Sequence, residues 1–351
     1  MGYYNGRELL EQKDINGKNP SIFVSTTNRS AGKTTYFIDM MAEKAVEDNK
    51  EFVLFFRSKD ELPACSLIVE SVTEMTGRKY EIKAGKKIGD NMVHTIYING
   101  ELKGYGIYLG HYVKLKKYSP LFSRVEYTLM DEYQPEDGKF LKNEVTAYMS
   151  LIYSISRGNG KQFRYVKNIL AGNLITLMNP YLIKSKLYKH IYIRENETNY
   201  FKTKGWVAEV GYNKDASQAL KDSSFADAFE NEGYIKNNLE ASYLFDASRF
   251  IGKIKSRKQR YIVTLRYNGC DYGVRADESS GNIYISSKHD PNCKTVIIFK
   301  ESEHTENTIH FEFCTEIIMH LTDCYYNARM YFDSLETKNT MFEILSLSIY
   351  R

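Results

Sequence analysis

The stretch Thr27-Asn28-Arg29-Ser30-Ala31-Gly32-Lys33-Thr34 decides the fold expected for this chain of 351 residues. A phosphate-binding P-loop has a glycine, four further residues, and then Gly-Lys followed by Ser or Thr. The stretch matches this pattern from Gly32 onward, whereas Thr27 stands in place of the first glycine. Residues 21–25 before it are mostly apolar, and an apolar-periodic segment runs from Thr34 to about Val46. This order of strand, loop and helix predicts a P-loop.

The matching part of the loop supplies the groups that bind phosphate. Successive backbone N–H groups and the N-terminus of the following helix cradle phosphate oxygens. Lys33 would place its charge on the β- and γ-phosphates, and the hydroxyl of Thr34 would ligate Mg²⁺. The alternative is a solvated turn that merely contains a lysine. The predicted ligands are ATP and Mg²⁺, and the predicted binding residues are Ser30, Ala31, Gly32, Lys33, Thr34 and Thr35.

A second motif lies at the end of the apolar strand expected over Tyr127–Met130, where Asp131 and Glu132 follow. Asp131 would hold the metal, and the adjacent Glu132 would polarise the attacking water. Two neighbouring carboxylates by themselves also fit a solvated loop. Downstream of a P-loop, the pair indicates nucleotide hydrolysis rather than simple binding or kinase chemistry.

Two further polar residues follow predicted strands. Asn173 comes after the strand Val166–Ala171, where a polar sensor would contact the γ-phosphate or the water; an ordinary turn asparagine is the alternative. Arg57 comes directly after the strand Phe52–Phe56 and would couple the state of DNA or of a neighbouring subunit to Glu132.

Arg157 stands at the end of a predicted helix, directly before Gly158. It is a candidate arginine finger, which stabilises transition-state charge and in ring motors acts on the nucleotide of the neighbouring subunit. The alternative is a cation that satisfies a helix C-terminus. The helix is predicted from one apolar face, made of Val145, Met149, Ile152 and Ile155.

Two clusters of basic residues indicate a nucleic-acid partner. The net charge of +4 is too weak to indicate one by itself. Such clusters contact phosphate backbones without reading sequence, which suits a protein that moves along DNA, although solvated faces are the alternative. The clusters comprise Lys114, Lys116 and Lys117, and Lys253, Lys255, Arg257, Lys258 and Arg260.

The order of elements predicts two domains. Alternating strands and helices favour an α/β domain with a mainly parallel sheet, including a hairpin over Ile96–Leu109 that turns at Asn99-Gly100. Residues 216–243 are helix-like and polar. We expect a P-loop domain over residues 1–200, a helical linker over 201–245 and an α+β domain over 246–351. The last domain is predicted from antiparallel strands over Tyr261–Tyr267, Tyr272–Ala276, Asn282–Ser286 and Thr295–Phe299, followed by helices over Thr315 to about Phe332 and Thr340–Ser348.

The composition excludes several classes of protein. No apolar run approaches the roughly 18 residues that span a bilayer, and Met1–Pro20 has no signal-peptide core. The five cysteines are scattered and form no zinc-binding spacing, which favours reduced thiols in a cytosolic setting. We therefore expect neither a membrane partner nor secretion.

The motifs together resemble those of the DNA-packaging ATPases of φ29-type short-tailed bacteriophages. The resemblance runs over most of the chain. It includes Gly32-Lys33-Thr34, Asp131-Glu132, the segment Asn143-Glu144-Val145 leading to Arg157, and Asn173 followed by Asn179-Pro180-Tyr181. It also includes three groups late in the chain, so it is not confined to the P-loop: Tyr267-Asn268-Gly269, Gly273-Val274 and His289-Asp290-Pro291.

The resemblance implies an ASCE P-loop ATPase, a class named for an additional strand and a catalytic glutamate. It implies a homomeric, pentameric ring in the host cytoplasm, at the portal vertex of a prohead, that translocates double-stranded DNA by ATP hydrolysis. It also implies a C-terminal RNase H-like domain that is a degenerate relative of terminase nucleases. The sequence leaves open the ring size and whether a packaging RNA is required.

Two alternative functions remain from the sequence. One is a terminase-like protein whose C-terminal domain cuts DNA, for which several converging acids would be needed. Most of the available acids lie in turn-like segments, which favours a DNA- or portal-binding remnant: Asp271, Asp277, Glu278 and Asp290. The other is a nucleotide-gated scaffold that binds ATP to assemble and does not hydrolyse it.

Overall fold

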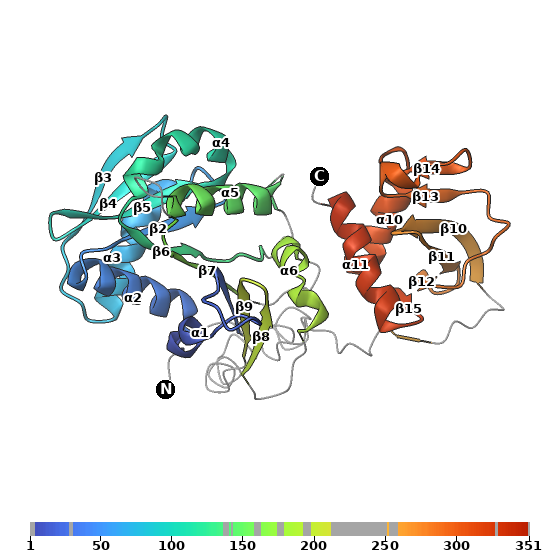
Figure 1. Cartoon of the computed structure of the whole chain (residues 1–351), viewed down its shortest axis with the longest axis horizontal. Helices are drawn as coiled ribbons and strands as arrows, with labels where there is room; N and C mark the ends of the chain where they lie inside the picture. The colour runs from blue at the N-terminus through green and yellow to red at the C-terminus, as the bar shows by residue number, and fades with distance from the viewer. Residues whose placement is uncertain are drawn as a thin grey trace. The chain divides into compact units, whose positions relative to one another are not determined.

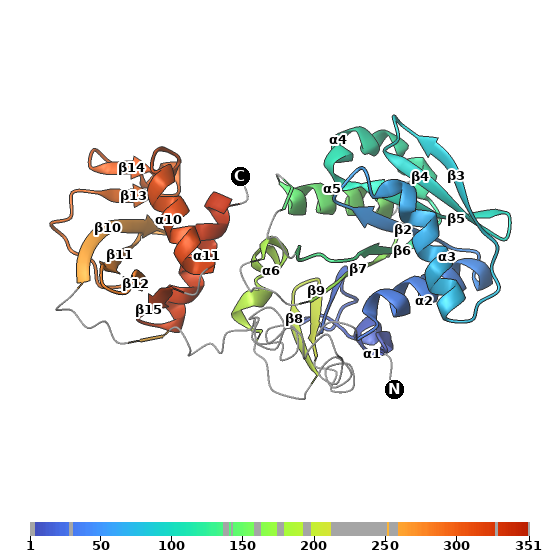
Figure 2. The ribbon, with the colours of Figure 1, turned by 180° about the vertical axis from the view of Figure 1, so that it is seen from behind.

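A computed structural model of the chain divides into two compact units, one formed by residues 1–177 and 184–244 and the other by residues 178–183 and 245–351. Figure 1 and Figure 2 show the elements of each unit from two sides. The residues that the structure describes are 4–27, 31–135, 140–141, 143–157, 163–173, 179–191, 198–211, 251–252, 259–326 and 329–349.

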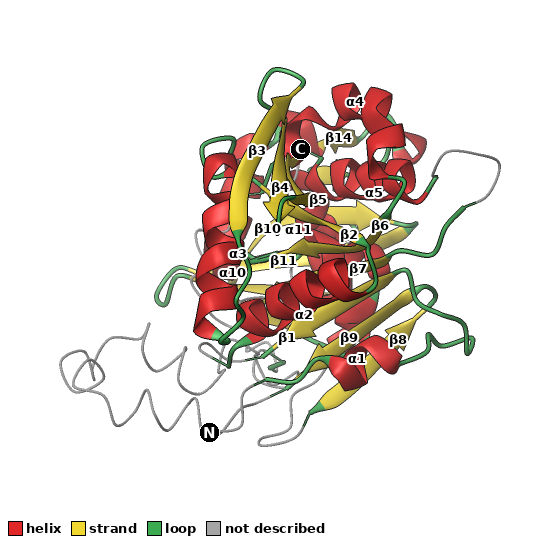
Figure 3. Ribbon diagram, turned by 90° about the vertical axis from the view of Figure 1, so that its left-hand side faces the viewer, coloured by secondary structure: helices red, strands yellow, loops and turns green. Residues whose placement is uncertain are grey.

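The described strands of the first unit form one nine-stranded sheet, in the order β3-β4-β5-β2-β6-β7-β1-β9-β8 (Figure 3). The central strands β5, β2, β6, β7, β1 and β9 pair in parallel, which confirms the mainly parallel sheet. The strands are β1 (Ile22–Thr26), β2 (Glu51–Phe56), β3 (Ile82–Ile88), β4 (Val93–Ile98), β5 (Glu101–Tyr108), β6 (Val125–Met130), β7 (Lys167–Gly172), β8 (Asn199–Thr203) and β9 (Trp206–Val210).

The position of β7 decides the class of the sheet. β7 pairs on one side with β1, which leads into the P-loop, and on the other with β6, which ends at Asp131. An additional strand therefore separates the P-loop strand from the acidic strand, which is the ASCE arrangement. Because the strands are parallel, their carboxyl ends lie at one edge of the sheet, where α/β folds bind ligands.

Helices cover both faces of this sheet. Alternate residues of β2 point to opposite faces, so Phe52 and Leu54 pack with the core beneath α2 and α3. Phe55 points the other way and meets Tyr148 of α5, with ring centroids 5.4 Å apart. The described α-helices of the first unit are α1 (Arg7–Glu11), α2 (Lys33–Glu47), α3 (Cys65–Met75), α4 (Tyr112–Leu115) and α5 (Glu144–Ser156), whereas most of α6 (Pro180–Ser185) belongs to the second unit.

The apolar face expected for α5 is partly wrong. Val145 and Ile155 are buried as expected, but Met149 is exposed. The buried face turns toward Tyr148 and Leu151 instead, because Tyr148 fills the space against β2. The helix ends at Ser156, and Gly158, which was expected to end it, lies outside the described residues.

The hairpin of β4 and β5 is confirmed. The strands pair antiparallel, and the turn residues Asn99 and Gly100 both have positive φ, of 53° and 80°. Tight two-residue turns with this backbone match the twist of the strands they join, which explains the Asn-Gly sequence.

The linker expected from residue 201 begins too early. Residues 199–210 form the strands β8 and β9, and β9 pairs in parallel with β1. All five residues of Trp206–Val210 are buried, so this strand belongs to the sheet. Most of the remaining linker, including the expected helical segment 216–243, lies outside the described residues.

The described strands of the second unit form a six-stranded sheet, in the order β14-β13-β10-β11-β12-β15. The meander β10-β11-β12 is antiparallel as expected, but β13 runs parallel to β10 and β14 parallel to β13, so the expectation of an all-antiparallel sheet is wrong. A meander followed by two strands parallel to its first strand is the order of an RNase H-like sheet. The strands are β10 (Gln259–Tyr267), β11 (Cys270–Asp277), β12 (Asn282–Ser286), β13 (Val296–Ile298), β14 (Thr308–His310) and β15 (Met330–Phe332).

Among the described residues of 245–351, the α-helices are α10 (Thr315–Tyr326) and α11 (Leu335–Ile349). The helix expected to reach Phe332 ends earlier, because Met330–Phe332 forms β15 and pairs in parallel with β12. Met330 and Phe332 are buried in the core of this unit, while Tyr331 between them is only partly buried, which is the alternation of a strand. In the part of the chain that the structure describes, no helix is long and apolar enough to cross a membrane.

Candidate nucleotide-binding site

The P-loop joins β1 to α2 at the carboxyl edge of the first sheet. Gly32 has φ of +95°, a left-handed conformation that a side chain disfavours, and α2 begins directly after it at Lys33. Thr27, which replaces the first glycine of the motif, accepts a hydrogen bond from Lys33 Nζ on its Oγ1 at 2.8 Å. The threonine therefore supplies a side-chain oxygen that glycine lacks, in addition to its backbone carbonyl oxygen, which accepts from the same Nζ at 3.3 Å. Ser30 lies outside the described residues.

Lys33 is buried and faces polar oxygens. Its side chain is 6% exposed, and Nζ lies 3.3 Å from Oδ1 of Asn173, at the end of β7. Burial lowers the pKa of Lys33 to about 8, because a charged amine loses water there, while the negative charges of Asp131 and Glu209 act in the opposite direction. A phosphate chain would supply the negative charge that keeps this amine protonated.

Asp131 and Thr34 form the second part of the site. Thr34 Oγ1 donates to Asp131 Oδ2 at 2.7 Å, and the backbone N–H of Glu132 donates to Asp131 Oδ1 at 3.1 Å. Burial raises the pKa of Asp131, and these two hydrogen bonds oppose the rise. Mg²⁺ takes carboxylate and hydroxyl oxygens as ligands, so this pair fits the metal that a nucleotide would bring.

Glu132 is presented by a strained turn after β6. Its φ is +51°, unusual for a residue with a side chain, and its side chain is exposed. Arg57 holds this turn by donating to the carbonyl oxygens of Glu132 and Tyr133, the latter at 2.6 Å. The same guanidinium pairs at 2.9 Å with Glu144, the first residue of α5, whose side chain is 1% exposed. Arg57 thus contacts the backbone beside Glu132 and links it to α5.

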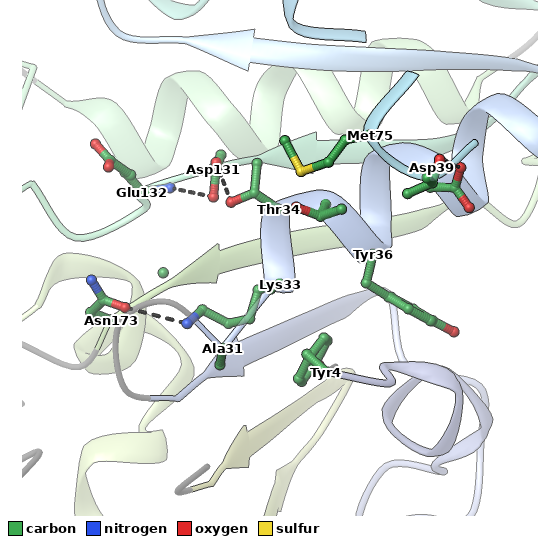
Figure 4. Close-up of a pocket in the computed structure, with 14 residues that line it drawn as sticks. Tyr4, Ala31, Lys33, Thr34, Tyr36, Asp39, Met75, Asp131, Glu132 and Asn173 are labelled. Atoms are coloured by element: carbon green, nitrogen blue, oxygen red, sulfur yellow. Dashed lines mark hydrogen bonds between the residues drawn. The ribbon is translucent and has the colours of Figure 1, made fainter. Parts of the chain in front are cut away.

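These groups line one cavity of about 750 Å³, a volume within the range of small-molecule sites. Figure 4 shows Asp131, Glu132 and Asn173 gathered around the start of α2, with Tyr36 and Met75 on opposite sides of that helix. The cavity is lined by Tyr4, Ala31, Gly32, Lys33, Thr34, Thr35, Tyr36, Asp39, Met75, Thr76, Asp131, Glu132, Gly172 and Asn173.

Sequence reasoning missed two groups beside the P-loop. The backbone N–H of Tyr4 donates to the carbonyl of Ala31 at 3.0 Å, which places the N-terminal segment against the loop. Glu209 on β9 is buried next to β1, where Ser25 and Tyr200 lie 3.5 and 3.4 Å from its carboxylate. Burial raises the pKa of Glu209 to about 7. Within the sequence, the glutamate in the otherwise apolar run Trp206–Val210 was the available signal.

The other predicted residues lie outside the cavity lining. Arg157 caps the end of α5 and is exposed, and no side-chain partner for it is found among the described residues. Lys116 Nζ lies 5.9 Å from the centre of the Tyr112 ring, and Lys114 and Lys117 are exposed nearby.

In the second unit, Arg260 is exposed and lies 3.6 Å from Glu278. The rest of its basic cluster lies outside the described residues: Lys253, Lys255, Arg257 and Lys258.

The acids of the second unit contact structural partners. Asp271 accepts two hydrogen bonds from Arg266, at 2.6 and 2.8 Å, and Arg266 lowers the pKa of Asp271. Asp277 and Asp290 each accept a hydrogen bond from a backbone N–H two residues later in the chain. Over the described residues of the chain, three or more acids, histidines or cysteines do not gather into a metal-binding group.

The fold and the cavity define a P-loop protein of the ASCE class. The chain belongs to the family described as podovirus DNA encapsidation protein (Gp16), whose model matches residues 1–348. Its function is viral DNA packaging.

Known relatives agree with this assignment. The DNA packaging protein of Bacillus phage phi29 is 22% identical over 320 residues, which cover 90% of each chain. That of Bacillus phage B103 is 22% identical over 286 residues, covering 80% of this chain and 82% of the relative.

Two solved structures share the fold of the whole chain. A chain of the bacteriophage Phi-29 viral genome packaging motor assembly matches with a TM-score of 0.57 and 20% identity, over 98% of this chain and 99% of that one. A chain of the Phi-28 gp11 DNA packaging motor matches with a TM-score of 0.62 and 14% identity, over 99% and 98%.

Proposed function

We propose that this chain hydrolyses ATP with Mg²⁺ in the cavity at the start of α2, and that hydrolysis drives DNA translocation during packaging. The observation that carries the proposal is the convergence of Lys33, Thr34, Asp131 and Glu132, from two separated segments of sequence, on one cavity. The ASCE strand order, with β7 between β1 and β6, places them at the same sheet edge.

Each residue has a distinct task in this proposal. Lys33 binds the β- and γ-phosphates after leaving Thr27 and Asn173, both of which now accept its hydrogen bonds. Thr34 and Asp131 hold the Mg²⁺, which when bound neutralises phosphate charge. Glu132 accepts a proton from the attacking water, and its strained turn, fixed by Arg57, sets where its carboxylate points. Asn173 contacts the γ-phosphate or that water.

Arg157 acts on a neighbouring copy in this proposal. α5 begins at Glu144, beside the site, and its 13 residues extend about 20 Å, since a helix rises 1.5 Å per residue. Arg157 at its far end is exposed and does not line the cavity of its own chain. A homomeric ring at the portal vertex of a prohead would bring it to the nucleotide of the next subunit. The ring is expected to contain five subunits.

DNA and the prohead are the proposed partners of that ring. The exposed Lys114, Lys116 and Lys117 would contact DNA phosphates, and the second unit would serve as a DNA- or portal-binding module.

The Glu132→Gln variant tests the proposal. The general base in such a reaction contributes on the order of 100- to 10,000-fold, so steady-state ATP hydrolysis should fall by that much. ATP and DNA binding should persist, because Lys33, Thr34 and Asp131 are intact. Glu126→Gln, on β6 in the same unit, is the matched control and should turn over like the wild type. Wild-type rates of ATP hydrolysis by Glu132→Gln would contradict the assignment of Glu132 as the general base.

Two further measurements separate the alternatives. Double-stranded DNA should stimulate ATP hydrolysis by a motor but not by a nucleotide-gated scaffold, which would show no turnover. Plasmid incubated with the protein and Mg²⁺ or Mn²⁺ should stay intact, whereas a terminase-like nuclease would cleave it.

A further inference from the structure

The cavity continues beyond the groups that a triphosphate requires. From Thr34 its lining runs along the first turns of α2 to Tyr36 and Asp39, and across to Met75 and Thr76 at the end of α3. Figure 4 shows Met75 on one side of α2 and Tyr36, with Tyr4, on the other. The part of the lining beyond Thr34 has no role in the phosphate and metal binding proposed above.

The two sides of this part of the cavity are apolar and held in place. Tyr36 makes edge contacts with Tyr4 and with Phe37, at centroid distances of 5.6 and 5.3 Å, which limit the positions of its ring. Met75 is 71% exposed, although burial of a methionine side chain is favourable. An aromatic ring and a thioether are surfaces against which a flat heterocycle packs well.

A carboxylate lies at the far end of the same space. Asp39 accepts hydrogen bonds from Arg78 Nε and Nη2, at 3.0 and 2.8 Å, and from Thr76 Oγ1 at 2.5 Å. Burial acts to raise the pKa of Asp39, but the bonds from Arg78 and Thr76 outweigh it and lower that pKa. These bonds also tie the end of α3 to α2, which fixes Met75 above the cavity. Asp39 is therefore an ionised group that only accepts hydrogen bonds.

We propose that Tyr36 and Met75 pack on the base of the bound nucleotide and that Asp39 accepts a hydrogen bond from its exocyclic amino group, so that the site selects adenine. This inference rests on the proposed function. An amino group donates to the carboxylate, whereas the keto oxygen of hypoxanthine in the same place would set one hydrogen-bond acceptor against another. Asp39, Tyr36 and Met75 thus set base specificity, and Lys33 and Asp131 remain the phosphate and metal groups.

Three ligands separate these contributions when their affinities for the full chain are measured with Mg²⁺: ATP, inosine triphosphate and ribose 5-triphosphate, which is ATP without its base. Stacking of a base on a side chain is worth about 5- to 150-fold in affinity, so ATP should bind at least about fivefold more tightly than ribose 5-triphosphate. Inosine triphosphate should bind more weakly than ATP.

Variants assign the effect to residues. Met75→Ala and Tyr36→Ala should each weaken ATP binding about fivefold and leave ribose 5-triphosphate unchanged, while Tyr36→Phe keeps the ring and most of the affinity. Leu67→Ala is the matched control, because Leu67 is 61% exposed on the same helix α3 and does not line the cavity. Met75 is exposed, so its variant tests the base site without a folding defect.

The possible outcomes distinguish failure of the base site from failure of the ATPase function on which it rests. Equal binding of ATP and ribose 5-triphosphate by the wild type would overturn the base site and leave the proposed ATPase intact. Equal binding of ATP and inosine triphosphate would overturn the role of Asp39. If the wild type bound none of the three ligands, the proposed function itself would fail.

Discussion

Two carboxylates, one in each unit of the chain, show how the same side chain serves two purposes. Asp131, after β6, is held by a hydroxyl and a backbone N–H, and burial raises its pKa. Asp271, on β11, is held by two N–H groups of Arg266, which lowers its pKa. Neutral donors orient Asp131 without cancelling its charge, whereas the guanidinium already neutralises Asp271. The first arrangement suits a group that must receive a metal ion. The second suits a carboxylate that stays paired with its arginine, either as a structural contact or, as proposed for Asp39 beside Arg78, as an acceptor for one more neutral donor.

The largest expected effect separates these two carboxylates directly. Asp131→Asn should lower ATP hydrolysis at least about 100-fold, because the metal loses a charged ligand. Asp271→Asn should leave hydrolysis unchanged and cost about 1–2 kcal/mol of stability, since it weakens a charged hydrogen-bonded pair. Parallel ATPase assays and urea unfolding of both variants check the contrast. Equal loss of ATP hydrolysis in the two variants would contradict the contrast between Asp131 and Asp271.

The next effect concerns the arginine of the first unit. Arg57→Leu removes a charged partner of the buried Glu144 carboxylate, which keeps a hydrogen bond from the backbone N–H of Leu141, and should destabilise the protein by about 3 kcal/mol. Arg7→Leu is the control, because the Arg7–Glu11 pair is exposed and should contribute less than about 1 kcal/mol. Urea unfolding measures both. Adding Glu144→Gln to Arg57→Leu should recover part of the loss, and no recovery would mean that the pair is not its source.

The buried carboxylate of Glu209 sharpens the comparison through the pH dependence of stability. The pKa of Glu209 is raised to about 7 in the folded chain, from an ordinary value of 4.5. The proton that it retains stabilises the fold at low pH, and this contribution is lost as the pH rises from about 4.5 through 7. Wild type should therefore lose on the order of 3 kcal/mol relative to Glu209→Gln between pH 4.5 and pH 8.

Denaturant unfolding of wild type and Glu209→Gln at several pH values checks this expectation. Glu74→Gln, an exposed change on α3, is the control and should follow the wild type. A difference in unfolding free energy between wild type and Glu209→Gln that did not vary with pH would contradict a raised pKa of Glu209. That result would show that its hydroxyl donors stabilise the ionised carboxylate as a cation would.

The sequence predicted most of the secondary-structure elements, each of which is formed by one continuous segment of the chain. The strand before the P-loop, the helix that begins at Lys33 and the strand that ends directly before Asp131 were confirmed as elements, because local apolar periodicity specifies them. The parallel pairing of β13 was missed, since periodicity does not report strand direction. The strand β15 was missed because three residues carry too little alternation to distinguish them from a helix end.

The sequence by itself thus predicted the residues that we propose bind phosphate and metal, because each lies in a short motif whose spacing carries its chemistry. Only the tertiary structure decided that Thr27 and Asn173 hold Lys33, that Arg57 fixes the turn of Glu132, and that Glu209 lies beside Ser25 on β1. Tyr36, Asp39 and Met75 also meet at one cavity only after α2 and α3 pack together. Those contacts join residues far apart in the chain, and burial and packing rather than local pattern bring them together.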